Sequence, residues 1–447
     1  MFASKDPHAI AETTRDPDGV ESDRVGKWSL TMAYWAMFSA MFWLYIAVAS
    51  QAAVGTLNTI IGMVLSIASY GAINAVLSRH AIRYGHTISS FSRAIFGPLG
   101  SALAALLFAV TAIYYATFEG SIIAVALREY FGGSMWLWYL AVVLYALPLV
   151  AHGVQNWLDK LNGVLLPLYV AGLIAIVVGA TIKQGYPSGW MTHTVAQSSA
   201  LPGWLSSYLI YMGVWVMMMY TYEFARLGRS QHQRFHGTVT FGWVFYLLTF
   251  GVNGLVGIYL VTAWKVEGTE TGVVTAILSS LGVVGLIVIV ISQTRINTAN
   301  YYAASTNLQD LAESISGRRT PRIVWVLVAG VFAYLFMLTD VLSYLLRALA
   351  WQGVFVTAWV AIALTAIYFN SHARPTATNP ATASEGYGFL SAWPILSWIA
   401  ASAIGIALTE QTMQPTLAAL SPAITVVIAV VLYAAGRVRG SQKQRIR

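Results

Sequence analysis

The sequence contains no cysteine and very few charged residues. Of its 447 residues only 9% are Asp, Glu, Lys or Arg, whereas 57% are hydrophobic. The absence of cysteine excludes disulfide frameworks, thiolate catalysis and cysteine-ligated metal sites. The shortage of charge excludes a soluble globular protein, because soluble chains carry about 25% charged residues. We therefore expect the chain to be solvated by lipid, with the bilayer as a partner.

Long apolar segments recur along the chain. A helix that crosses the hydrocarbon core of a bilayer needs about 20 predominantly apolar residues. Strands of a membrane barrel would alternate apolar and polar residues, but residues 281–291 form an unbroken apolar run, so we predict an all-α integral membrane protein. We count twelve candidate spans, which begin near Trp28, Val54, Ala102, Ser134, Leu161, Trp204, Thr238, Gly272, Ile323, Leu342, Tyr387 and Thr416.

The basic residues predict an orientation in the membrane. Twenty of the 25 Lys and Arg residues fall in tails and loops on the same side as the N-terminus. Basic residues accumulate on the cytosolic side, so we predict a multi-pass protein of the cell inner (plasma) membrane with both termini cytosolic. The same distribution accounts for the net charge of +8, and we expect no nucleic-acid partner. The predicted cytosolic segments are the tail 1–27, the linker 371–386 and the basic tail 436–447.

The spacing of the predicted helices indicates an internal repeat. The first five helices, at about 28–182, and the next five, at about 204–370, begin at a nearly constant offset. Because each repeat has an odd number of helices, the second repeat has the opposite orientation in the membrane, as in many secondary transporters. We therefore predict a 5+5 inverted-repeat transporter core over residues 28–370, followed by two C-terminal helices over residues 387–435.

Signatures of catalysis are missing from the sequence. It has no Gly-rich phosphate loop, no HExxH motif and no GxSxG motif. We expect no enzyme, no cofactor and no bound metal. A membrane enzyme or a sensor remains the alternative from a different functional class.

Polar residues at membrane depth are the candidate functional groups, because a charge there costs about 2.5–3.5 kcal/mol on insertion scales. In the third span Tyr115 and Glu119 share a helix face at positions i and i+4. The eighth span has a polar island, in which Arg295 is either a functional charge or an interfacial arginine that reaches toward the cytosol. Its asparagines either bind a solute or form hydrogen bonds within and between helices. The polar residues of this island are Gln293, Thr294, Arg295, Asn297, Thr298 and Asn300.

Two spans differ in how they signal a break. The sixth span contains Gly213, Trp215 and three consecutive methionines, which suit a helix that can break, although such a stripe is also typical of an ordinary core. The first span has neither Gly nor Pro near Trp35, which argues against a discontinuous first helix. Glu223 and Arg226, at i and i+3, are expected to form a structural ion pair.

Three segments together resemble the nucleobase-cation symport family, which includes purine/cytosine permeases and hydantoin and allantoin transporters. The resemblance covers about residues 28–369 and is carried by residues 92–97 with Gly100 and Ser101, residues 223–226 and residues 297–302. It implies the inverted five-helix-repeat fold with two extra helices, and a central site between spans one, three, six and eight that binds a flat nitrogen heterocycle. By this resemblance Tyr115 and Trp215 are the stacking aromatics, Glu119 takes the place of a span-three amide, and Asn300 is the span-eight Asn. Asn297 and Trp35 are further candidates for substrate binding.

The departures from the family are informative. Sodium-coupled members have adjacent hydroxyl residues in span eight, whereas this chain has Thr294 followed by Arg295, and Glu119 carries a charge where an amide is expected. We predict a secondary active transporter of a small planar nitrogen-rich solute such as a nucleobase, hydantoin or ureide. It is expected to work without sodium, with Arg295 paired to Glu119 in place of the coupling cation and with a proton as the alternative coupling ion. An amino-acid or amine carrier of the same fold, in which Glu119 receives an ammonium group, is the competing prediction.

Overall fold

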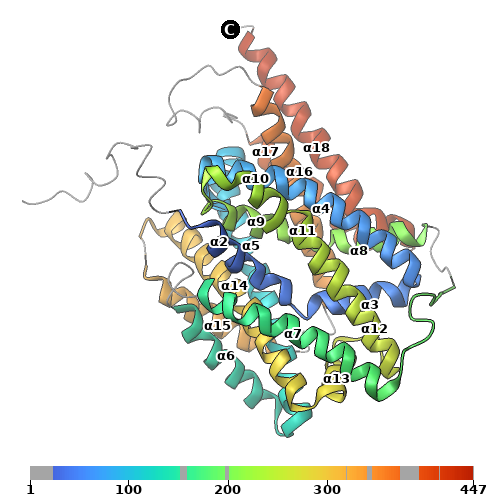
Figure 1. Ribbon diagram of the computed structural model, residues 1–447. Coiled ribbons are helices and arrows are strands. Elements are labelled where there is room, and N and C mark those ends of the chain that lie inside the picture. Colours follow the sequence, from blue (N-terminus) through green and yellow to red (C-terminus); the bar gives the residue numbers. More distant parts are fainter. Residues whose placement is uncertain are drawn as a thin grey trace, which may run out of the picture.

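The computed structural model describes residues 24–151, 159–196, 201–318, 320–339, 345–372, 392–411 and 413–445. Within these ranges the chain is helical and contains no β-strand (Figure 1). The first half contains α2 (Lys27–Tyr34), η2 (Trp35–Ser39), α3 (Phe42–Val54), α4 (Thr56–Tyr84), α5 (Ile88–Phe131), α6 (Met135–Ala151) and α7 (Asp159–Gln184).

The second half contains more interruptions. After α8 (Gly203–Met212) and α9 (Val216–Ala225), a helical stretch over Ser230–Trp264 includes two π-helical turns, η5 (His236–Thr240) and η6 (Leu247–Val252), and ends with α12 (Asn253–Trp264). The remaining helices are α13 (Glu270–Leu281), α14 (Val283–Ser316), α15 (Arg322–Met337), α16 (Leu345–His372), α17 (Trp393–Thr409) and α18 (Pro415–Arg445).

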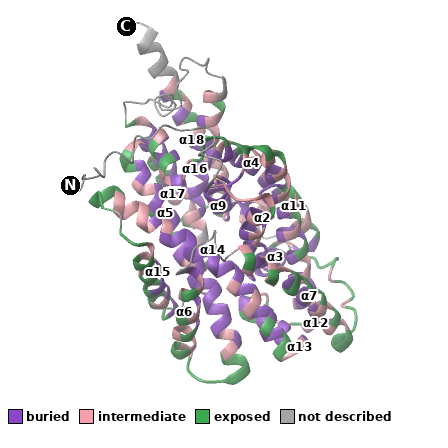
Figure 2. Ribbon diagram, turned by 60° about the vertical axis from the view of Figure 1, so that its left-hand side comes forward, coloured by how far each residue is buried: buried purple, intermediate pink, exposed green. Residues whose placement is uncertain are grey.

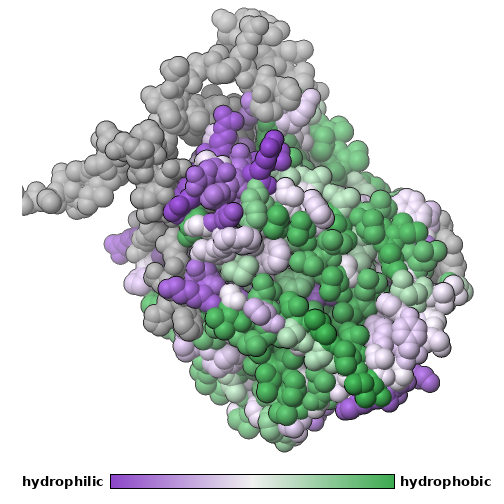
Figure 3. All heavy atoms as spheres, in the orientation of Figure 1, coloured by the Kyte–Doolittle hydropathy of each residue, from purple (hydrophilic) through white to green (hydrophobic). Residues whose placement is uncertain are grey.

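Length and composition identify a multi-pass membrane protein. Among the described residues seven helices are long and apolar enough to cross a bilayer, or eight when the bent pair Lys27–Ser39 and Phe42–Val54 is one span. Four shorter apolar helices accompany them: Met135–Val150, Glu270–Leu281, Arg322–Met337 and Trp393–Thr409. Figure 3 shows apolar side chains over the middle of one face, with hydrophilic groups gathered near the N-terminal segment. The all-α membrane class is confirmed, and the count of twelve spans stays a prediction.

Helices α5 and α14 form the centre of the bundle, where most side chains are buried (Figure 2). Glycines allow the close packing there. A Cβ on Gly172 of α7 would lie 2.6 Å from the Val288 side chain of α14, and one on Gly285 of α14 would lie 2.6 Å from the Ile277 carbonyl oxygen of α13. Because these helices approach so closely, polar residues of α14 reach the helices around it.

The first span is interrupted, so the expectation of a continuous first helix was wrong. Its two parts, Lys27–Ser39 and Phe42–Val54, meet at a 43° bend, with Ala40 extended at φ −56° and ψ 130°. No glycine or proline makes this break. Side chains of other helices replace the lost helical hydrogen bonds, because Gln293 accepts from the Met41 amide at 3.1 Å and Asn253 donates to the Phe38 carbonyl at 2.6 Å.

The sixth span breaks where the sequence indicated. Helix α8 ends at Met212 and α9 begins at Val216, with Gly213 in the gap. Helix α16 crosses at this point, because a Cβ on Gly353 would lie only 2.9 Å from the Gly213 Cα. The two glycines let α16 touch the backbone of the break.

Two further glycines shift the predicted helix boundaries. The third span begins at Ile88 rather than near Ala102 and is kinked at Gly97, whose φ of 77° is accessible mainly to glycine. The predicted eighth span is divided at Gly282, with φ 60°, into the short α13 and the long α14. The predicted starts near Leu342 and Tyr387, most of the tail 1–27 and most of the linker 371–386 lie outside the described residues. Helix α18 continues to Arg445, into the predicted basic tail.

Candidate functional site

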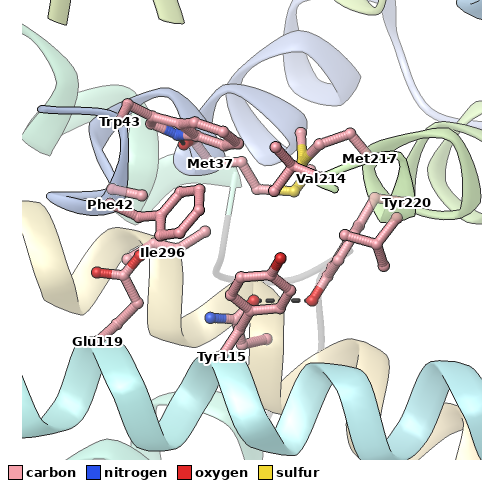
Figure 4. A pocket seen from close by; sticks show the side chains of 12 residues that line it. Met37, Phe42, Trp43, Tyr115, Glu119, Val214, Met217, Tyr220 and Ile296 are labelled. Atoms are coloured by element: carbon pink, nitrogen blue, oxygen red, sulfur yellow. Dashed lines mark hydrogen bonds between the residues drawn. The ribbon is translucent and has the colours of Figure 1, made fainter. Parts of the chain in front are cut away.

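A small cavity, with about 20 Å³ open to water-sized molecules, lies between the two interrupted spans. The first and sixth spans contribute residues beside their breaks, and α5 and α14 complete the walls (Figure 4). The lining residues are Met37, Ala40, Phe42, Trp43, Tyr115, Glu119, Val214, Val216, Met217, Tyr220, Ile296 and Asn300. The main chain at both breaks is therefore close to any bound molecule.

Aromatic rings form the walls of this cavity. Trp43 and Tyr115 lie on opposite sides of it in Figure 4, and Phe42 contacts Tyr115 edge-on with ring centroids 5.9 Å apart. The Trp43 indole N–H donates to the Met37 carbonyl at 2.7 Å, which holds the ring across the break in the first span. Flat aromatic walls suit a flat ligand, because planar rings stack on aromatic faces.

One end of the cavity carries the buried carboxyl group of Glu119, which is 1% exposed. The Gln293 amide nitrogen donates to its Oε2 atom and, at 3.1 Å, to its main-chain oxygen. The backbone amide of Phe42 also acts as a donor to this carboxyl group. Phe42 begins the second half of the broken first span, and a helix N-terminus favours a negative charge. Glu119 therefore occupies the anion-binding end of α3.

The amide of Asn300 lies at another part of the wall. The Tyr220 hydroxyl donates to Asn300 Oδ1 at 2.8 Å, whereas Asn300 Nδ2 has only a long contact of 3.5 Å with Asn297 Oδ1. The Asn300 amide nitrogen is therefore placed to donate a stronger hydrogen bond to a ligand acceptor.

Arg295 is fully buried against the first span. It is 0% exposed, its Nη2 donates to the Trp35 carbonyl at 2.9 Å, and its guanidinium lies 6.0 Å from the Tyr169 ring centroid. Its Nε and Nη1 atoms have no hydrogen-bond partner in the structure. Full burial rules out the alternative of an interfacial arginine that reaches toward the cytosol.

The predicted ion pair between Arg295 and Glu119 was wrong. Among the described residues the ion pairs join Glu223 to Arg226 and Arg347 to Glu410. Residues two positions apart on an α-helix point about 200° apart, so Gln293 faces Glu119 and the start of α3, whereas Arg295 faces Trp35 in the first half of the first span. The sequence identified the charge of α14 but not the side of the helix that it faces.

Four other predicted residues lie outside the cavity lining. Thr294 bonds to the Val290 carbonyl at 2.6 Å and to the Tyr145 hydroxyl at 2.7 Å, facing α6. Asn297 packs against Gly120 of α5. The Trp35 ring donates to the Thr240 carbonyl at 3.3 Å. Trp215 lies in the break of the sixth span, and its buried indole N–H has no acceptor.

Sequence reasoning missed several residues of the site. Phe42, Trp43 and Tyr220 line the cavity, and Gln293 holds the carboxyl group of Glu119. Gln293 belongs to the polar island of the eighth span and Tyr220 follows the methionine stripe, so a signal existed for these two. No sequence signal pointed to Phe42 and Trp43, because their place in the cavity wall depends on the break in the first span, which the sequence did not indicate.

Glu223 and Arg226 form the expected structural ion pair, at 3.0 Å. Glu223 is buried and also accepts from the Ile88 amide at 3.1 Å, which ties α9 to the first turn of α5. No group of three or more His, Asp or Glu residues in the described part of the chain is placed to hold a metal ion.

The fold is similar to that of solved membrane transporters. No protein-family model and no curated protein sequence matches the chain. The structure of Mhp1, a nucleobase-cation-symport-1 family transporter, in a closed conformation with bromovinylhydantoin bound, matches with a TM-score of 0.69 and 16% identity over 92% of each chain. The inward-facing conformation of Mhp1 matches with a TM-score of 0.71 and 16% identity, over 95% of this chain and 92% of Mhp1.

A Na⁺-coupled sialic acid symporter has the same fold. It matches with a TM-score of 0.66 and 12% identity, over 92% of this chain and 89% of the symporter. These likenesses establish an Mhp1-like transporter fold in a multi-pass membrane protein, and the resemblance drawn from the sequence is confirmed for the fold. The similar structures are transporters.

Proposed function

We propose that the protein is a secondary active transporter of a small planar nitrogen-rich solute and that it works by alternating access. The observation that carries this proposal is the aromatic-walled cavity, with Glu119 and Asn300 in its lining, between the two broken spans. Mhp1, which has the same fold, has been solved with a hydantoin derivative bound. A site between two interrupted helices suits alternating access, because each half-helix can move around a fixed ligand.

The residues of the cavity favour a nucleobase, a hydantoin or a ureide. Trp43 and Tyr115 supply two flat faces, and stacking on an aromatic residue contributes about 1–3 kcal/mol per base in nucleic-acid complexes. Glu119 accepts hydrogen bonds from ring N–H groups, and the Asn300 amide nitrogen donates to a ring carbonyl. A heterocycle with N–H and C=O groups on its edge satisfies both.

The position of Glu119 disfavours an amino acid as substrate. In this fold the N-terminus of a half-helix is the natural place for a substrate carboxylate. Here the Phe42 amide at the start of α3 already faces the carboxyl group of Glu119. A second carboxylate would meet a like charge, so an amine without a carboxylate is the second candidate, favoured by Glu119 itself.

Arg295 supports transport without sodium. Its guanidinium binds the Trp35 carbonyl at the end of the first half of the broken first span, where unwound carbonyls and helix C-termini hold coupling cations in transporters of broken-helix design. An arginine stays protonated at all physiological pH values. A permanent cation at this place both satisfies the carbonyl and repels a second cation.

Glu119 is the candidate carrier of a coupling proton. It is a titratable group in the cavity wall, and Gln293 and Phe42 hold it with neutral donors rather than a cation. Its carboxyl group can therefore change protonation without breaking an ion pair.

The predicted topology belongs to the same proposal. Both termini lie in the cytosol, the protein resides in the cell inner (plasma) membrane, and residues 28–370 form two inverted five-helix units. The breaks support this arrangement, because the first and sixth spans are equivalent in such a repeat and both are interrupted.

Binding and flux measurements test the proposal. Purified protein is screened by thermal shift against nucleobases, hydantoins, ureides and small amines, and the best binder is followed into proteoliposomes. Uptake of the chemically unchanged solute, with counterflow against an internal pool, supports a carrier. Conversion of the solute would indicate an enzyme, flux without counterflow would indicate a channel, and the absence of any binder would contradict the proposed substrate class.

A further inference from the structure

A surface rich in basic residues lies where the first and second spans meet the segment between the sixth and seventh spans. The start of α2, the end of α4 and residues 227–240 form it, and both helices pack against η5 of that segment. Figure 3 shows hydrophilic side chains gathered near the N-terminal segment, next to apolar side chains over the spans. The residues of this basic surface are Arg24, Lys27, Arg79, Arg83, Arg229 and Arg234.

Hydrogen bonds join the three segments into one continuous surface. Arg24 Nη1 donates to the Gly228 carbonyl at 3.1 Å, and Arg229 Nε donates to the Arg24 carbonyl at 3.3 Å. On the other side of the surface, Gln233 Nε2 donates to the Arg79 carbonyl at 2.8 Å. Basic residues that are far apart in the sequence are therefore held close together.

The segments that form the basic surface contain no acidic residue. Asp and Glu are absent from residues 24–39, 56–87 and 227–246. Within the described part of the chain, the ion pairs join Glu223 to Arg226 and Arg347 to Glu410, so they include none of the six basic residues. The positive charge of this surface therefore has no balancing carboxylate among the described residues.

Elsewhere on the predicted cytosolic side, acidic and basic residues are mixed. Lys160 follows Asp159 at the start of α7, and Arg318 follows Glu313 at the end of α14. The preference for basic residues in cytosolic loops does not explain this contrast, because Asp and Glu contribute little to membrane orientation. The absence of acids from the basic surface therefore needs a separate reason.

The basic surface borders the lipid-facing surface of the spans. On α4, Val76, Arg79 and Arg83 lie on one helix face at positions i, i+3 and i+7, and Val76 is 41% exposed. At the start of α2, Trp28 is 59% exposed and contacts Phe235 edge-on, with ring centroids 5.2 Å apart. Exposed tryptophans at span ends lie at the level of the lipid headgroups, so the arginines of α4 lie at that level too.

We propose that the basic surface binds the headgroup of an anionic phospholipid in the leaflet at this end of the molecule. Guanidinium groups donate paired hydrogen bonds to phosphate oxygens. The acyl chains would contact exposed apolar side chains further along the spans, such as Val76 and Trp243, which packs against α4 at Gly71. A soluble phosphate compound would use the arginines alone, whereas a phospholipid uses both the arginines and the apolar border.

Lipid binding to the purified full-length protein tests this proposal. Native mass spectrometry gives dissociation constants for phosphatidylglycerol and for phosphatidylcholine with the same acyl chains. We expect phosphatidylglycerol to bind about tenfold more tightly or better, and the difference to shrink as the ammonium acetate concentration rises. Each basic residue beside an anionic lipid should contribute about fivefold in affinity.

Variants at exposed positions locate the site. Arg79→Gln combined with Arg83→Gln should weaken phosphatidylglycerol binding by about 25-fold and leave phosphatidylcholine binding unchanged. Lys160→Gln combined with Arg318→Gln is the matched control, since it removes the same charge where acids and bases are mixed, and it should have less than about a twofold effect. Arg234→Gln should weaken binding by about fivefold and tests the surface from a second segment if the α4 variant does not fold. Thermal unfolding in phosphatidylcholine checks that each variant is folded.

Four outcomes would overturn the proposal. Equal constants for the two lipids, or equal losses in the α4 variant and its control, would show that only net charge matters. Glycerol phosphate binding as tightly as phosphatidylglycerol would indicate a soluble ligand. Lipid selectivity that appears only after Asp16, Asp18, Glu21 and Asp23 are replaced by their amides would make the acidic N-terminal tail the partner of this surface. Because no transported solute is used, none of these outcomes bears on the proposed central substrate site.

Discussion

The guanidinium of Arg295 donates a hydrogen bond to the main-chain carbonyl of Trp35 at 2.9 Å, which puts a buried positive charge at the break of the first span. The carbonyl belongs to η2, the last turn before the break. Helix C-terminal ends carry partial negative charge, so the contact is favourable on both sides. The arginine therefore links α14 to the first half of the broken first span.

This contact predicts uptake without sodium. With choline replacing sodium on both sides of proteoliposomes, the initial rate for the best binder should be unchanged, because the place of a cation is already filled. Arg295→Gln should lower uptake by about tenfold or more, since removing one partner of a buried charged hydrogen bond costs about 1.5–3 kcal/mol. Arg295→Lys, which keeps the charge, is the matched control and should retain more activity. A strict sodium requirement in the unmodified protein would contradict the idea.

The sequence predicted the membrane class and the fold because both follow from bulk properties. Span length and the spacing of apolar runs are set by the bilayer and are visible residue by residue. The break in the first span was not predictable in the same way. Its cause lies in Gln293 and Asn253, which are more than 200 residues away and bond to Met41 and Phe38.

The residues of the candidate site that lie on regular helix could be predicted from the sequence, and those that depend on contacts between helices could not. Tyr115 and Glu119 line the cavity because they share a face of one regular helix, as their spacing indicated. Which neighbouring helix the Arg295 side chain faces depends on how α14 is rotated about its axis relative to α5. No local sequence pattern determines this rotation. The side that Trp215 presents depends on the irregular backbone of the sixth span, so helical periodicity could not place it.

The two tryptophans beside the breaks should differ in their effect on binding. Trp43 lines the cavity and Trp215 does not. Trp43→Ala should therefore weaken binding of the best ligand by about tenfold or more, as expected for one lost stacking face, and Trp43→Phe should be partly tolerated. Trp215→Ala is the comparison, measured by the same titration. If Trp215→Ala weakens binding more than Trp43→Ala, the sixth-span tryptophan is the stacking residue, as the family resemblance implied.

Close packing of α12 against α3 predicts a stability effect. A Cβ on Gly257 would lie 2.5 Å from the Leu44 carbonyl oxygen, which cannot move aside without moving the helix. Gly257→Ala should therefore destabilise the protein by about 1–3 kcal/mol, as overpacking does, and lower the midpoint of thermal unfolding in detergent. Gly251→Ala is the control, because its nearest contact would be an ordinary 3.5 Å. An unchanged midpoint for Gly257→Ala would show that this contact is not tight.

The distribution of basic residues predicts the side on which the chain ends. A reporter that is active only in the cytosol, fused after Arg447, should be active, and one that requires export should be inactive. The same pair of reporters fused in the loop after Gly133, between α5 and α6, should give the reverse result. Export-dependent activity at the C-terminus would overturn the orientation, and with it the inverted repeat.

Glu119→Gln should separate accumulation from exchange. The substitution keeps the size of the side chain and a hydrogen-bonding group beside Gln293 but removes the titratable proton. If Glu119 carries the coupling proton, an imposed proton gradient no longer drives accumulation in the variant, because its central site cannot change protonation between the two sides. Counterflow needs only solute exchange and should persist, with affinity reduced by the lost charge. Glu223→Gln is a control for a buried acid that serves an ion pair outside the cavity. It should affect both assays in parallel through folding. Gradient-driven accumulation by Glu119→Gln at the level of the unmodified protein would remove Glu119 from the coupling step and leave it as a substrate contact alone.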